Sequence, residues 1–198
     1  MKYYKALFGS IFFIVVLLGL YYAHVTFVRV NVVLYSAMFD GVLAASAAAA
    51  LLFSCRYFTV LNPFEKVQLT IIWLLSGYLF AISIPTVIDR SLSFYILEKI
   101  QQRGGGIQLA KFEEVFTKEY VKEHRLVDVR LTEQQESGTI ILQDGCVRLT
   151  ERGQKLASFS RFFRQNLLPK QRLLMGKYTD DLTDPFRFSS SSADYACK

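Results

Sequence analysis

The sequence predicts a mainly α-helical protein with three transmembrane helices, followed by a smaller polar domain that contains a two-stranded hairpin. Three observations lead to this fold class. Before residue 89, apolar residues form three runs that are each long enough to cross a bilayer, which needs about 20 residues. After residue 88, the chain carries 15 of its 17 acids and 18 of its 23 bases. Finally, Asp144-Gly145 stands between two short β-branched runs, as in a tight hairpin.

The three apolar runs are expected to be uncleaved membrane spans. They cover residues 6–28, 32–54 and 69–88. A cleaved signal peptide is the alternative for the first run. That run is too long for a signal peptide, and Tyr21 stands where cleavage after Ala23 would need a small residue. Residues 1–88 are therefore predicted to form the transmembrane region of a multi-pass protein.

The second span combines small residues with an acid. Its small residues are Gly41, Ala44, Ala45 and Ala48. Such residues let helix backbones approach closely, so we expect this span to pack against protein. Asp40 costs about 3 kcal/mol within hydrocarbon, and such a carboxylate normally faces protein or water. It is either a partner contact or polar step in a lipid or ion path, or a protonated acid bonded to the hydroxyl of Tyr35 or Ser36.

The second half of the chain predicts three helices, a hairpin and a last helix. The helices are expected at about 92–103, 109–121, 124–137 and 151–168. Ser91 and Thr150 are expected to cap the first and the last of them, because hydroxyl side chains accept from the free N–H groups of a helix start. Asp144-Gly145 is the preferred pair for a two-residue type I′ turn between TIIL and CVRL.

This order of elements is that of a winged-helix domain. The segments VRLTEQQESGTI and LTERGQKLA are similar to the third helix, wing and last helix of MarR-type and PadR-type winged-helix domains. The matching residues are Arg130, Leu131, Gly138, Ile140, Leu149, Thr150 and Gly153. Gln134 departs from the pattern, which has an apolar core residue there. The resemblance implies a winged-helix-like α+β domain with a two-stranded wing over residues 89–175, and we expect residues 176–198 to form a polar tail.

The resemblance implies that the third helix reads DNA, through Arg125 and Arg130. Residues 123–137 nevertheless carry a net charge of −2. An acidic helix repels the phosphates that supply most DNA affinity, so nucleic acid is not expected as a partner.

The positive charge lies further along, where residues 148–172 have a net charge of +6. The basic residues of this expected surface are Arg148, Arg152, Lys155, Arg161 and Arg164. A basic amphipathic helix beside a membrane anchor suits anionic headgroups or the acidic face of a partner. The alternative is a solvated helix whose phenylalanines pack the core of the domain.

No pattern in the sequence indicates catalysis, a metal site or a cofactor. Gly104–Gly106 follows a predicted helix and lacks the Lys-Ser/Thr pair of a phosphate-binding loop. Cys55, Cys146 and Cys197 show no C-x-x-C spacing, so we expect free thiols.

We therefore expect a non-enzymatic accessory or adaptor protein of a bacterial inner membrane. Its partners would be the bilayer and either a membrane protein or a second copy of the chain. A membrane-tethered transcriptional regulator is the alternative, and a transporter or channel subunit that uses Asp40 is a third hypothesis. Flanking positive charges do not decide the orientation, because four lie at each end of the spans. The winged-helix character favours a cytoplasmic C-terminal half, whereas the first span, with its N-terminus inside, would place that half outside.

Overall fold

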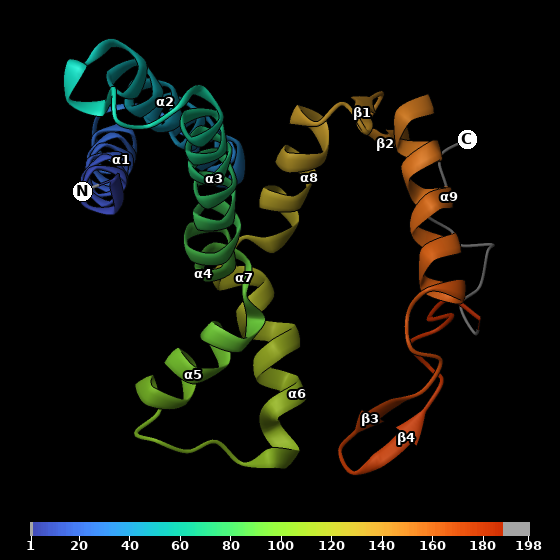
Figure 1. The fold of residues 1–198 in the computed structure, drawn as a ribbon. Helices are drawn as coiled ribbons and strands as arrows, with labels where there is room; N and C mark the ends of the chain where they lie inside the picture. The colour runs from blue at the N-terminus through green and yellow to red at the C-terminus, as the bar shows by residue number, and fades with distance from the viewer. Residues whose placement is uncertain (1, 188–198) are drawn as a thin grey trace. The chain divides into compact units, whose positions relative to one another are not determined.

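A computed structural model describes residues 2–187 of the chain. Helices account for 71% of it, and the predicted mainly helical class is confirmed. The chain divides into two compact units, of which the first ends at His124 and the second begins at Arg125. Figure 1 shows the three long helices of the first unit, and the helices and hairpins of the second.

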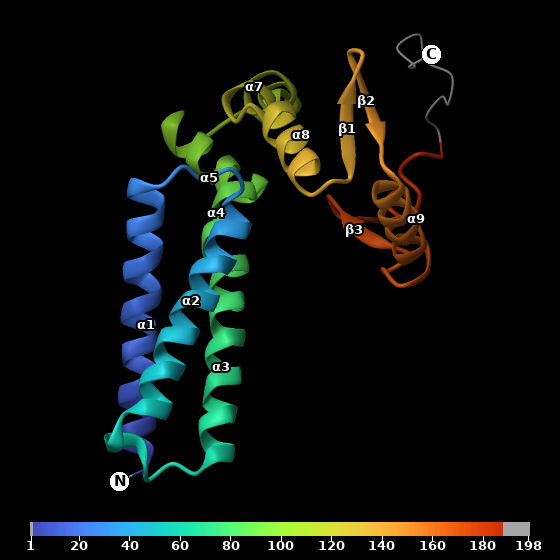
Figure 2. The ribbon, with the colours of Figure 1, turned by 90° about the horizontal axis from the view of Figure 1, so that it is seen from above.

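The first unit contains the three predicted spans. They are α1 (Lys2–Phe27), α2 (Val33–Ser54) and α3 (Pro63–Ala81), which continues through a π-helical turn (Ile82–Thr86) into α4 (Val87–Arg90). Each is long and apolar enough to cross a membrane, so this is a membrane protein. The three helices run side by side, and the α2–α3 connection lies at the end of the bundle where the chain begins (Figure 2).

Local chemistry explains where the third span begins and why it contains a π-helical turn. Asn62 and Glu65 form a capping box: each side chain accepts from the other's backbone N–H at 2.8 Å. Pro63 stands at the first helical position, where the N–H it lacks is not needed. Pro85 cannot donate within the helix and its ring crowds the preceding turn, and the helix takes its π form at this position.

Small residues set the spacing of the bundle. Gly41 and Gly77 bring α2 and α3 into backbone contact, since a Cβ added at Gly77 would lie 3.0 Å from the Gly41 Cα. Ala44, Ala45 and Ala48 are buried inside the bundle, at 0–1% exposure. The small-residue face of α2 therefore packs against α1 and α3 of the same chain, and it offers no free surface to a second protein.

A helical segment follows the spans in the same unit. It consists of α5 (Leu92–Gln102), a 3-10 turn (Leu109–Lys111), α6 (Phe112–Glu114), a π-helical turn (Val115–Tyr120) and α7 (Val121–Glu123). The Ser91 hydroxyl caps α5 as predicted, accepting from Phe94 N at 3.3 Å. Tyr95 and Lys99 are the buried side chains of α5.

The second unit joins one helix to a hairpin, a second helix and a further hairpin. Its elements are α8 (Leu126–Glu136), β1 (Ile140–Gln143), β2 (Cys146–Leu149), α9 (Glu151–Asn166), β3 (Arg172–Leu174) and β4 (Lys177–Thr179). The Asp144-Gly145 turn is confirmed, because both residues have positive φ (53° and 73°) and Gln143 pairs with Cys146. The β3–β4 hairpin was not predicted, since its turn, Met175-Gly176, lacks the usual Asn or Asp.

The motif Leu149-Thr150-x-x-Gly153 fastens α9 to the base of the first hairpin. The Thr150 hydroxyl accepts from Gly153 N at 3.1 Å and donates to the Gly138 carbonyl at 2.7 Å. The Thr150 amide donates to the Thr139 carbonyl at 3.1 Å. A Cβ on Gly153 would lie 2.0 Å from that carbonyl oxygen, so only glycine fits. These contacts explain why Gly138, Thr150 and Gly153, three residues of the winged-helix resemblance, occupy their positions.

Winged-helix identity itself is not confirmed. The sequence grouped α5 to α9 into one domain, whereas the contacts place α5 to α7 in the unit of the spans. At Gln134, the position that departs from the family pattern, the side chain is exposed and bonds to the Thr139 hydroxyl. Cys55 is a free thiol as expected, but Cys146 takes part in a disulfide. An odd number of cysteines does not exclude one bond.

Candidate functional site

Helix α9 presents an uncovered apolar stripe. Leu156, Phe159, Phe163 and Leu167 recur at helical spacing along one face, with exposed fractions of 53%, 60%, 40% and 61%. Gly153 is the only buried residue of this helix. Within the second unit, these phenylalanines are therefore not packed into a core. Burying four such side chains would stabilise the protein by on the order of 6 kcal/mol. This stabilisation is absent while the stripe is exposed to water.

Two cations accompany the stripe at its N-terminal end. Arg152 precedes Leu156 by four residues, and Lys155 precedes Phe159 by four, so each lies one turn before a stripe residue. Both side chains are exposed, and Lys155 makes only a surface ion pair with Glu151 at 2.6 Å. We call the stripe together with Arg152 and Lys155 the α9 surface. It combines apolar area with cations, as interfacial helices do.

Arg161 and Arg164 point elsewhere. They line a hollow of about 300 Å³ between α9 and residues 183–186, on a face that excludes the stripe. The Thr183 hydroxyl donates to the Lys170 carbonyl at 3.0 Å, and this holds the segment near the end of α9. Residues 183–186 thus lie against α9 of their own chain.

The remaining basic residues are dispersed. Arg148 is exposed on β2. Arg125, the residue before α8, pairs with Asp128, and Arg130 of α8 pairs with Glu133, each at 2.8 Å. Both arginines that the family resemblance assigned to DNA reading therefore have carboxylate partners on their own helix. A base edge would have to compete with these carboxylates.

A polar pair lies within the membrane region. His24 Nδ1 of α1 is 2.7 Å from Asp40 Oδ1 of α2, and the Asp40 side chain is 3% exposed. Asp40 Oδ2 is buried and has no hydrogen-bond partner in the described part of the chain. The partner of Asp40 is thus an imidazole, and neither of the hydroxyls considered from the sequence. His24 could not be identified as a partner from local sequence, because the contact joins two helices across 16 residues.

A charged cluster holds the segment that follows the spans. Lys99 is 5% exposed and contacts Glu119 at 2.7 Å and Glu123 at 2.6 Å. These hydrogen bonds, that of Glu119 foremost, raise the pKa of Lys99. In return, the hydrogen bond from Lys99 lowers the pKa of Glu119 and of Glu123. Tyr95 also donates to Glu123 at 2.9 Å, so the cluster is internally satisfied and we assign it a structural role.

Among residues 2–187, no group of three or more His, Cys, Asp or Glu side chains is placed to hold a metal ion. Comparison of the chain with protein-family models, with curated proteins and with solved structures found no match. The function must therefore be inferred from the surfaces of the molecule.

Proposed function

We propose that this chain is a non-enzymatic accessory protein of a bacterial inner membrane, in which α9 binds anionic lipid headgroups at the membrane surface. The uncovered apolar stripe of α9, accompanied by two exposed cations, carries this proposal. A soluble core would cover the stripe, whereas the interfacial zone of a bilayer accepts apolar side chains and cations together. The three spans keep the second unit near the bilayer, and a tethered surface needs little intrinsic affinity to stay bound.

We further propose that the second unit faces the outside of the cytoplasmic membrane. Two observations support this side. The first span usually sets the orientation, and the N-terminal lysines favour an inner N-terminus. The disulfide at Cys146 suits an oxidising compartment, because cytosolic thiols are kept reduced. The basic residues of α9 do not contradict this orientation, because they lie more than 60 residues beyond the last span. Segments of that length are translocated regardless of their charge.

A membrane-tethered regulator remains the competing function, and the net charge of −2 on residues 123–137 weighs against it. Under the lipid proposal, the order of α8, hairpin and α9 is a winged-helix-like arrangement that serves contacts other than DNA. Salt-dependent binding of the full chain to duplex DNA would favour the regulator.

Hydrogen exchange tests the lipid proposal. The full chain is placed in nanodiscs of phosphatidylcholine, with or without phosphatidylglycerol. We expect the amides of residues 156–166 to exchange about tenfold more slowly, or slower still, when the anionic lipid is present. Each Lys or Arg near an anionic surface contributes about 1 kcal/mol. The double variant Arg152→Gln/Lys155→Gln should therefore lose most of the effect of phosphatidylglycerol.

The matched control is Lys111→Gln/Lys118→Gln, which removes two exposed cations from the other unit. This variant should leave the exchange of α9 unchanged. Equal exchange of α9 in both lipids for the wild-type chain would contradict the proposal.

A further inference from the structure

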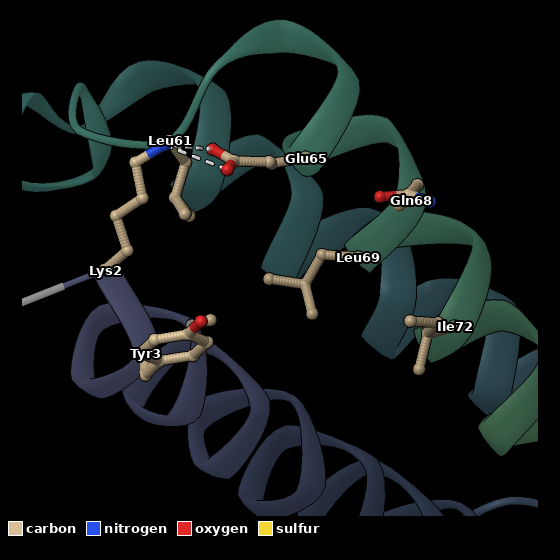
Figure 3. Close-up of a pocket in the computed structure, with 8 residues that line it drawn as sticks. Lys2, Tyr3, Leu61, Glu65, Gln68, Leu69 and Ile72 are labelled. Atoms are coloured by element: carbon tan, nitrogen blue, oxygen red, sulfur yellow. Dashed lines mark hydrogen bonds and ion pairs between the residues drawn. The ribbon is translucent and has the colours of Figure 1, made fainter.

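A second lipid-facing feature lies within the bundle, at the end where the chain begins. Helices α1 and α3, together with Leu61 before α3, line a half-open cavity of about 590 Å³, which is within the usual range for a ligand pocket. Apolar side chains form most of its wall, among them Ala6, Leu69 and Ile72. Figure 3 shows Leu69 and Tyr3 at the space between the two helices. Both helices are long and apolar enough to cross a membrane, so lipid would have access to this opening.

The cavity has a polar outer end, and at its inner end the two helices pack closely. At the inner end, Gly9 packs against Trp73, since a Cβ on Gly9 would lie 3.2 Å from the ring. At the outer end, Lys2 reaches across from α1 and donates to both carboxylate oxygens of Glu65, at 2.9 and 3.1 Å (Figure 3). Gln68 also lines this end. An apolar interior with a polar rim matches the division of a phospholipid into acyl chain and headgroup.

Charge at this end favours an anionic headgroup. Four cations, Lys2, Lys5, Arg56 and Lys66, lie at this end of the spans against the single acid Glu65. Glu65 is already engaged by Lys2 and by the capping box of α3. The Lys2 ammonium has three N–H donors and is 49% exposed, so it retains a donor for a phosphate oxygen.

We propose that this cavity binds one anionic glycerophospholipid, with an acyl chain between α1 and α3 and the phosphate at Lys2. The site is independent of the α9 surface, which belongs to the other unit. Phosphatidylglycerol is the probe, and phosphatidylcholine is the zwitterionic reference.

Native mass spectrometry of the full chain in mild detergent tests this site. Wild-type protein should retain one phosphatidylglycerol molecule in preference to phosphatidylcholine. Ala6→Phe fills the cavity and should weaken retention about tenfold, which corresponds to about 1.4 kcal/mol. Ala23→Phe is the matched control, because Ala23 is exposed on the same helix and does not line the cavity. It should bind lipid as the wild type does.

Lys2→Gln provides a second variant in case Ala6→Phe does not fold. It should remove the preference for the anionic lipid while retaining binding of a phospholipid. Equal loss in Ala6→Phe and Ala23→Phe would overturn the proposal, and so would an unchanged lipid preference in Lys2→Gln. Arg152→Gln/Lys155→Gln should retain the bound lipid, so failure of this site and failure of the α9 proposal are distinguishable.

Discussion

Replacing Gly153 by alanine should detach α9 from the first hairpin. The new Cβ would lie 2.0 Å from the Thr139 carbonyl oxygen and 3.1 Å from Leu149 Cδ2. Backbone cannot yield by that much, so the clash must break the contact between the helix and the hairpin. Overpacking typically costs about 1–3 kcal/mol, and we expect the upper end or more here, because the obstructing atom is main chain.

Helix propensity alone predicts the opposite effect of Gly153→Ala on the stability of α9. Alanine is about 1 kcal/mol better than glycine within a helix, so without the clash Gly153→Ala would stabilise α9. Hydrogen exchange of the full chain is the measurement, read at the Thr150 amide that donates to Thr139. Exchange there should accelerate in Gly153→Ala and stay unchanged in Ser158→Ala, an exposed position of the same helix. Slower exchange in Gly153→Ala would contradict the packing described above.

Removing His24 alone should destabilise the bundle more than removing the whole polar pair. In His24→Leu, Asp40 would keep a buried carboxyl without its only partner in the described residues. Breaking a buried pair in this way costs about 3–5 kcal/mol. The double variant His24→Leu/Asp40→Leu replaces the pair by apolar groups and should recover most of that loss, because apolar substitution of a buried pair is often neutral.

Unfolding of the full chain in mixed micelles measures this coupling. We expect His24→Leu to be the least stable of the variants, with the double variant close to the wild type. Ala23→Leu serves as the control for added apolar volume at an exposed neighbouring position. The free energy of unfolding is also measured for Asp40→Leu. If the losses in His24→Leu and Asp40→Leu add up to the loss in the double variant, His24 and Asp40 are not coupled.

Local chemistry accounts for what the sequence predicted well. The three spans follow from apolar length, and the caps at Ser91 and Thr150 follow from a hydroxyl preceding an amphipathic run. The Asp144-Gly145 turn follows from the positive φ that both positions require. Each of these signals lies within a few neighbouring residues, which is why one sequence is enough to find them.

The features that the sequence missed depend on contacts between distant elements. His24 and Asp40 meet only because α1 and α2 pack antiparallel, and Lys99 is buried only because two glutamates approach it from another helical segment. The exposure of the α9 stripe was likewise undecided, since the same periodicity fits a soluble core and a membrane surface. Periodicity identifies an apolar face, whereas packing decides what covers it.

The most direct test of the proposed function is the membrane topology. A reporter active only in the periplasm and a fluorescent reporter active only in the cytoplasm are each fused after Lys198 and compared in a bacterial host. We expect signal from the periplasmic reporter alone, which places the second unit outside the cytoplasm and removes DNA as a partner. Signal from the cytoplasmic reporter alone would contradict the proposed orientation, and it would restore the membrane-tethered regulator as the leading hypothesis.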